Sequence, residues 1–324
     1  MERLMCSALL LVFIAAVTEA ASWNYSPTSD YGPHNWGKKF PEYCDPNSYP
    51  RQSPIDIKKG LLVFDSSLQK MRHENFDTKN VLFQAQNNGH TVQFNVDGDV
   101  ETEGGPVDNV HYYALQLHFH WGDSNPMDGH GSEHTILGQQ HKAEMHIVNV
   151  NHKHDKLDIS EVIKKDDGLL VLGVFIDVVD KSKNQMPNEE FAKIIEGAEM
   201  VKDRAGSKYN MSRGYINLEK LMPMNPEHYY TYPGGLTTPS CHGAVTWVVY
   251  KNPIYITQEQ LSVFYTVKDE DGKNLTNIFR PPQSVNDRVV KTTNPEDGNA
   301  NGASNNVQVT LALVFFAFLL SLFL

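Results

Sequence analysis

Short runs of apolar residues alternating with polar ones dominate the middle of the chain. The runs are rich in Val, Ile, Phe, Tyr and Thr and are bounded by Gly, Asn, Asp and Pro, which is typical of β-strands and turns. The segment Asn87–His90 reads as a hairpin turn, because Asn and Gly tolerate positive φ. The pattern predicts strands at Val81–Gln86, Thr91–Val96, Tyr113–Trp121, Ala143–Val150, Leu169–Val179, Ala244–Tyr250 and Phe264–Val267.

Helical periodicity is confined to a few segments. Phe191, Ile194 and Ala198 recur at helical spacing within residues 188–202, directly after Pro187, and a shorter helix is expected over residues 257–263. The chain shows no internal repeat and no long linker between these elements. We therefore expect one domain of the mainly β (α+β) class, with small helices at its periphery.

The N-terminal end is hydrophobic but short. Arg3 precedes the apolar run Leu9–Val17, which cannot span a bilayer, and polar sequence begins soon after Ala20. This layout predicts a signal peptide over residues 1–20, removed from the mature protein. The alternative is a buried N-terminal helix.

The C-terminal end is also hydrophobic. Residues 307–324 carry no charge and nothing polar follows them, while the stretch Asp297–Ser304 is small and polar. Small residues, a polar spacer and an apolar tail are the layout of a GPI-attachment signal. We therefore expect a folded domain over 21–292, a polar linker over 293–306 that holds the attachment residue, and a removed tail over 307–324. A simple tail anchor is the alternative.

Charge and cysteines narrow the class of protein further. The net charge of −11 argues against nucleic acid as a partner, because phosphate binding needs a basic surface. Once the signal peptide is removed, Cys44 and Cys241 form an even pair in an oxidising compartment, which predicts a disulfide rather than two free thiols. A crosslink over so long a loop contributes at most roughly 5 kcal/mol. Sequons for N-glycosylation begin at Asn24, Asn210 and Asn274.

Two of the predicted strands carry histidines with metal-ligand spacing. Side chains alternate along a strand, so His118 and His120 share one face while Phe119 faces the other way. If the strand with His146 pairs beside the first, a third imidazole joins them. Three nitrogen ligands leave the fourth tetrahedral position open to water, which is the pattern of a catalytic zinc.

Polar neighbours strengthen this interpretation. Gln116 shares a face with His118, and Glu144 shares a face with His146, so each can accept the outer N–H of a ligand and orient it. A bare His-x-His motif is more often an ordinary pair of satisfied histidines. The remaining histidines in polar sequence are interpreted as ordinary surface residues, among them His73, His152, His154 and His228.

The motifs around these histidines resemble the α-class carbonic anhydrases. The resemblance runs from about Tyr31 to about Arg288, so it covers nearly the whole expected domain. Its motifs are long and occur in the family's order: Arg51–Ile57, Asn87–His90, Gln116–Gly122, Gly131–Thr135, Ala143–His146, Tyr232–Pro239 and Val245–Trp247.

The resemblance implies a large, twisted, mostly antiparallel sheet with Zn²⁺ at the base of a conical cleft. It implies reversible hydration of CO2 to bicarbonate and a proton by zinc-bound hydroxide. Thr237 matches the family's gatekeeper, which accepts a hydrogen bond from the hydroxide and donates one to Glu133. Thr238 would line the same pocket. The apolar pocket for CO2 would consist of Val148, Val171, Leu236 and Trp247, although plain core packing explains these four equally well.

The resemblance also implies a route for the released proton. His90 matches the family's proton-shuttle histidine, and an imidazole with a pKa near 6.5 is suited to that work. Asn88 and Tyr31 would order the waters between zinc and His90. A disulfide that steadies the threonine loop is frequent among extracellular relatives, and Cys241 is well placed for it.

Two further hypotheses remain beside an active enzyme. One is a carbonic-anhydrase-like binding domain without catalysis, and the other is an acidic mineral-matrix protein that uses short runs such as Asp269–Asp271. The partners expected for the enzyme are CO2 and bicarbonate, together with a membrane through the GPI anchor and a place near bicarbonate transporters. The expected state is a monomer at the extracellular face of the plasma membrane, or secreted.

Overall fold

The computed structural model describes residues 23–124 and 130–298. Both predicted terminal signals, residues 1–20 and 307–324, lie outside this range. One sheet of thirteen strands runs through the described domain, and a separate two-stranded sheet pairs β1 with β8. The strands are β1 Asp56–Ile57, β2 Leu62–Phe64, β3 Met71–Glu74, β4 Leu82–Asn87, β5 Val92–Asp97, β6 Glu101–Gly104, β7 Tyr112–Trp121, β8 Thr135–Ile136, β9 Ala143–Asn151, β10 Leu169–Val178, β11 Lys208–Asn210, β12 Tyr229–Gly234, β13 Val245–Tyr250, β14 Ile254–Ile256 and β15 Val290–Thr292.

The main path of the large sheet is β11-β4-β5-β7-β9-β10-β13-β12-β15-β2, and β3, β6 and β14 pair off this path. Most neighbours are antiparallel, whereas β10 runs parallel to β13 and β14, and β15 runs parallel to β2. The expected fold class, a large and mostly antiparallel sheet with few small helices, is confirmed.

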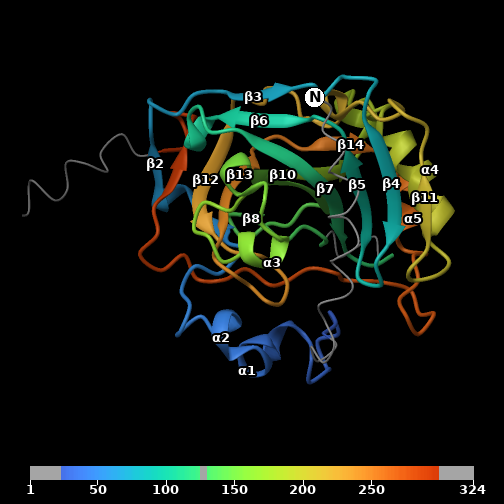
Figure 1. The fold of residues 1–324 in the computed structure, drawn as a ribbon, viewed down its shortest axis with the longest axis horizontal. Helices are drawn as coiled ribbons and strands as arrows, with labels where there is room; N and C mark the ends of the chain where they lie inside the picture. The colour runs from blue at the N-terminus through green and yellow to red at the C-terminus, as the bar shows by residue number, and fades with distance from the viewer. Residues whose placement is uncertain (1–22, 125–129, 299–324) are drawn as a thin grey trace, which may run out of the picture.

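The helices are short and peripheral (Figure 1). Among the described residues the α-helices are α1 Trp36–Lys39, α2 Pro41–Cys44, α3 Ile159–Val162, α4 Phe191–Val201 and α5 Gln258–Phe264. Figure 1 shows α1 and α2 together at one end of the domain, away from α4 and α5. Short 3-10 helices occur at Pro33–Asn35, Lys59–Leu61, Gly105–Val107, His152–His154, Lys181–Lys183 and Leu218–Leu221. No helix within the described ranges is both long and apolar enough to cross a membrane.

Alternation along β9 separates the two faces of the sheet. Met145 and Ile147 belong to the apolar cluster that includes Phe191 of α4 and Phe264 of α5. Val148 and its same-face neighbours belong to a second cluster on the opposite side. Burial of large apolar side chains on both faces stabilises the sheet, at roughly 25 cal/mol for each Å² removed from water. The sheet therefore lies between two apolar cores. Helices cover one of them, and the other borders the site described below.

One predicted strand is wrong. Residues 264–267 do not form a strand, because Phe264 ends α5, where it is fully buried with Leu261 on the same helical face. Thr257 caps the N-terminus of this helix through a capping box with Gln260. The prediction of a strand at residues 264–267 did not take this capping box into account. The other six predicted strands are present within one or two residues of their expected ends.

Residues that follow the expected end of the domain still contact it. Asn294 is buried, and the Asp297 carboxylate pairs with Lys251 at 2.5 Å and accepts from the Tyr230 hydroxyl at 3.2 Å. Residues 293–298, which were expected to begin a linker, are therefore packed against the domain. Any chain that connects the domain to an anchor starts after them.

Candidate metal centre

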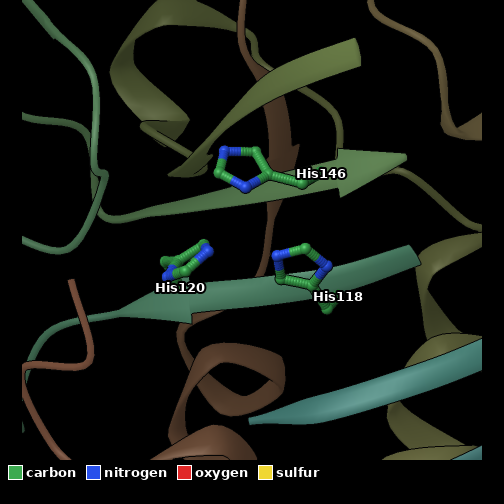
Figure 2. Close-up of side chains that lie close together, drawn as sticks. All are labelled: His118, His120 and His146. Atoms are coloured by element: carbon green, nitrogen blue, oxygen red, sulfur yellow. The ribbon is translucent and has the colours of Figure 1, made fainter. Parts of the chain in front are cut away.

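Three imidazoles come together on neighbouring strands. In the antiparallel pairing of β7 with β9, His118 lies directly opposite His146, and His120 lies opposite Glu144. One ring nitrogen from each of His118, His120 and His146 lies within 4.8 Å of the other two. Figure 2 shows two of the rings rising from one strand and the third from its neighbour, all toward a common point. The ladder hydrogen bonds of a central sheet thus fix all three Cα positions.

A hydrogen-bond partner holds the outer nitrogen of each ring. Gln116 Oε1 lies 3.0 Å from His118 Nδ1, and Glu144 Oε1 lies 2.7 Å from His146 Nε2. His120 Nδ1 lies 2.9 Å from the backbone oxygen of Ile278. These contacts direct Nε2 of His118, Nε2 of His120 and Nδ1 of His146 toward the common point. The two side-chain acceptors expected from the alternation are in place, whereas the acceptor for His120 had no sequence signal.

The chemistry of these donors fits zinc. Burial lowers the pKa of His118 well below its usual value and that of His120 to about 3, so both rings are neutral at pH 7, as metal ligands must be. His120 Nε2 is buried and has no hydrogen-bond partner among the described residues, which a metal ion at the common point would satisfy. Three imidazole nitrogens form the protein ligand set of a catalytic zinc with one open position.

Glu144 is the centre of a buried network behind His146. Its Oε1 faces His146 Nε2 and His134 Nδ1, both at 2.7 Å, and its Oε2 accepts the backbone N–H of His134 at 2.8 Å. Although burial raises the pKa of Glu144, the two histidines bring that pKa well below its usual value. A methyl group at Gly173, which lies opposite His146 on β10, would stand 3.1 Å from this carboxylate. His134 and Gly173 were not identified from the sequence as site residues, although a glycine inside an apolar strand indicates a close approach.

Thr237 and Glu133 lie together beside the histidines. The Thr237 side chain is hydrogen-bonded to Glu133, and both residues are buried. Glu133 Oε1 accepts the backbone N–H of Arg280 at 2.8 Å, and Oε2 lies 3.3 Å from His120 Nε2. Burial raises the pKa of Glu133 well above its usual value, and the contacts with Thr237 and Arg280 oppose that shift.

A disulfide ties down the loop that follows Thr237. Cys44 at the end of α2 is bonded to Cys241, as expected. The Cys241 N–H donates to the Thr238 oxygen at 2.7 Å, while the Leu236 N–H donates to the His242 oxygen at 2.9 Å. The loop is therefore attached both to β12 and to the N-terminal helices.

The expected apolar pocket residues form one row next to the metal centre. Val148, Val171 and Trp247 stand opposite one another on β9, β10 and β13. All three are buried, and Leu236 packs against the same cluster. The Trp247 ring lies 4.8 Å from the His146 ring, so the row begins at a metal-centre histidine.

His90 lies in the turn between β4 and β5. Asn88 Oδ1 accepts the backbone N–H groups of His90 and Thr91, and Gly89 has φ +85°. The His90 ring stacks on Trp23 at 3.9 Å, and burial lowers its pKa to about 4. In this position the ring is neutral at pH 7.

Tyr25, and not Tyr31, is the tyrosine near the metal centre. None of the contacts that the structure gives Tyr31 within the described ranges joins it to His90 or to the three histidines. The Tyr25 ring lies 6.5 Å from that of His120, and burial, together with the nearby Glu133, raises its pKa well above the usual value. The sequence offered no spacing that distinguishes the two tyrosines.

Two histidines expected at the surface have structural contacts instead. His73 stacks on Phe76 and lies 3.2 Å from Thr102 Oγ1, and burial lowers its pKa to about 4. His154 is buried with its Nε2 2.7 Å from Asp167. Neither lies in the metal centre. The polar residues that flank both histidines in the sequence had led to the prediction that the two rings lie at the surface.

Comparisons with a family model and with individual proteins all point to one family. A sequence model described as eukaryotic-type carbonic anhydrase matches residues 31–294. Carbonic anhydrase 12 of Homo sapiens is 34% identical over 320 residues, which cover 94% of this chain and 84% of that protein. Carbonic anhydrase 7 of Mus musculus is 36% identical, covering 84% of this chain and 97% of that protein. Carbonic anhydrase 6 of Homo sapiens is 30% identical, covering 91% of each.

Proposed function

Because the chain belongs to the eukaryotic-type carbonic anhydrase family, we propose that it is an active, zinc-dependent enzyme that hydrates CO2 reversibly to bicarbonate and a proton. The observation that carries the proposal is the convergence of three imidazole rings, each with its outer nitrogen held by an acceptor. His118, His120 and His146 would hold the zinc. When bound there, the ion would lower the pKa of water to about 7 and so supply hydroxide at neutral pH.

Thr237 and Glu133 orient the nucleophile in this proposal. A zinc ion beside Glu133 would favour the ionised form of its carboxyl group against the effect of burial. An ionised carboxylate only accepts hydrogen bonds, so Glu133 would direct the Thr237 proton toward itself. The threonine oxygen is then left to accept a hydrogen bond from the attacking species, which fixes the direction of its lone pair. The Arg280 N–H donates to Oε1 of Glu133 and keeps the carboxyl group in position.

The apolar row gives CO2 a place to approach without binding it tightly. Val148, Val171, Leu236 and Trp247 have no charge to offer, and CO2 has none to be recognised. Thr238, which is partly exposed beside them, borders the same space. Weak binding suits turnover, because affinity shared equally by substrate and transition state does not raise kcat.

His90 carries the released proton away in this proposal. It lies in a turn rather than in a strand ladder, so its side chain can leave the stack on Trp23 more readily than a core histidine could move. Asn88 holds the turn and, with a partly exposed side chain, can order water beside the ring. Tyr25 replaces Tyr31 as the tyrosine that borders this route.

The decisive experiment measures zinc and activity on the same sample. Purified residues 21–298 should contain one zinc per chain and hydrate CO2 in stopped-flow assays, and Thr237→Ala should keep the zinc but lose roughly 100-fold in kcat/KM. Zinc without hydration by the unaltered domain would support the alternative of an inactive binding domain. Calcium binding without zinc would support the mineral-matrix alternative.

We also propose that the protein works outside the cell. The Cys44–Cys241 disulfide supports an oxidising compartment, and Asn24, Asn210 and Asn274 are all exposed, as glycosylation requires. A GPI anchor would keep the domain at the outer face of the plasma membrane, as a monomer near bicarbonate transporters. Release of activity from cells by a phosphatidylinositol-specific phospholipase tests the anchor, and retention after treatment would favour a simple tail anchor.

A further inference from the structure

The turn that carries His90 is joined to an acidic loop distant in sequence. This loop, residues 269–271, lies between Lys268 and Asn274, which form an antiparallel bridge. The buried side chain of Asn87 donates to the Lys268 oxygen at 2.8 Å and accepts the Gly89 N–H at 2.9 Å. One amide group therefore fixes the acidic loop against the turn.

Glu270 lies directly over this turn. A Cβ atom at Gly89 would stand 3.2 Å from Glu270 Cγ and 3.5 Å from its Oε1. The carboxylate is thus in contact distance of the residue that precedes His90. Its closeness depends on Gly89 having no side chain.

The other charged groups of the loop around Glu270 have partners. Lys273 Nζ lies 3.2 Å from Asp271, the Lys273 N–H donates to Asp269, and Lys268 Nζ donates to Asn274. Within the described ranges, no ion pair or hydrogen bond holds the exposed Glu270 carboxylate. Its negative charge therefore remains available on the solvent side of the turn.

We propose that Glu270 is a positioning residue for proton release, which draws the protonated His90 ring to the solvent side of the turn and selects the charge of the buffer that collects the proton. The proposal rests on the proposed function. A His90 ring that carries a proton is a cation, and the stack on Trp23 gives a cation little hydration. A carboxylate outside the stack stabilises that cation electrostatically at a position close to bulk buffer.

The same charge acts on the acceptor. A fixed negative charge repels hydrogen phosphate, which is a dianion, and stabilises the imidazolium that forms when imidazole accepts the proton. In the balanced step, the N–H bond of protonated His90 breaks and a bond between that proton and the buffer base forms. No other reactant takes part.

The test is Glu270→Gln with two buffers. The rate constant for proton transfer to hydrogen phosphate should rise roughly twofold, and that to imidazole should fall roughly twofold. Both changes in rate constant should become smaller at 0.5 M salt, because exposed charges are then screened. Since proton release follows CO2 conversion, kcat should change while kcat/KM does not. Equal changes in both buffers, or no change in either, would overturn the proposal.

Matched variants separate this role from general charge and from folding. Asp271→Asn removes a negative charge from the next residue in the chain, whose carboxylate is already paired with Lys273. This substitution should leave both rate constants nearly unchanged. In a His90→Ala background, Glu270→Gln should lose its effect. Unchanged melting temperatures would exclude unfolding as the cause of any change.

A measurement without turnover distinguishes failure of this inference from failure of the proposed function. Glu270→Gln should lower the pKa of His90, followed by NMR, because a nearby carboxylate stabilises the imidazolium. If the domain hydrates no CO2 but this shift occurs, the proposed function fails and the placement of Glu270 stands. If hydration occurs and the His90 pKa is unmoved, Glu270 has no such role.

Discussion

The metal centre and the turn of His90 are held in different ways. His118, His120 and His146 lie on β7 and β9, in the middle of a sheet whose hydrogen-bonded ladders continue on both sides. His90 lies between two strands, held by the side chain of Asn88 and a stack on Trp23. The proposed metal ligands thus occupy the ladder, and the proposed proton carrier lies outside it. Changes in the two regions should therefore fail in different ways.

Removal of a ligand from the ladder should have the largest effect. His118→Ala should reduce zinc affinity by far more than the 10- to 100-fold typical of losing an outer partner, and CO2 hydration should be lost with it. Metal analysis after dialysis and stopped-flow rates measure both. His34→Ala, at an exposed histidine outside the centre, serves as the control. Full zinc occupancy in the variant would show that the three rings do not act as one site.

Removal of the crosslink should come next. Cys241→Ser, paired with Cys44→Ser to avoid a free thiol, should lower the free energy of unfolding by about 2–5 kcal/mol. Activity should fall too, because the disulfide positions the backbone of Cys241, whose N–H donates to the Thr238 oxygen. Urea unfolding and kcat/KM measure the two effects. If the urea midpoint does not move, the loop is held without its disulfide.

Glu144→Gln should weaken the metal centre while the ladder stays intact. The amide oxygen could still accept from both histidines, but the NH2 group would then face the backbone N–H of His134, donor against donor. The side chain would be displaced, so zinc affinity should fall roughly 10- to 100-fold. Competition with a chelator measures this, and Glu161→Gln, at an exposed glutamate, is the matched control. An unaltered affinity would mean that the strands alone orient His146.

Removal of His90 should leave metal binding unchanged. His90→Ala should slow hydration roughly tenfold when buffer is scarce, because proton transfer then lacks its carrier, and added imidazole should restore the rate. Zinc content should equal that of the unaltered domain. Normal turnover in dilute buffer, or failure of imidazole to rescue, would contradict the role of His90.

The smallest expected effect is on the stack. Burial against Trp23 disfavours the charged form of His90, so Trp23→Ala should raise its pKa from about 4 toward the ordinary value of 6.5. NMR titration of the ring protons measures this directly. The sign also predicts that the stacked arrangement loses stability as pH falls from about 6.5 to 4, because the unfolded chain binds the proton first. A pKa unmoved by the substitution would place the cause elsewhere.

The sequence predicted best where one periodicity decided the outcome. Alternation along β7 and β9 located the histidines and two of their acceptors, because a strand places every second residue on one face. It could not find Ile278, whose backbone oxygen carries no side-chain signature, or choose Tyr25 over Tyr31, because that choice depends on how the N-terminal segment folds back. The strand assigned to residues 264–267 failed because a short run with three apolar residues is equally compatible with the end of a helix and the residues that follow it.

The bond from His120 to Ile278 has a consequence for the order in which the chain is made. The two residues are 158 positions apart, so a ribosome completes all three histidines long before it adds the acceptor of the second. A nascent chain that ends before this acceptor holds all three histidines, but only two of the rings have their outer-nitrogen acceptors. We therefore expect the site to reach its full affinity for zinc late in biosynthesis, after Ile278 has been added and has packed against His120.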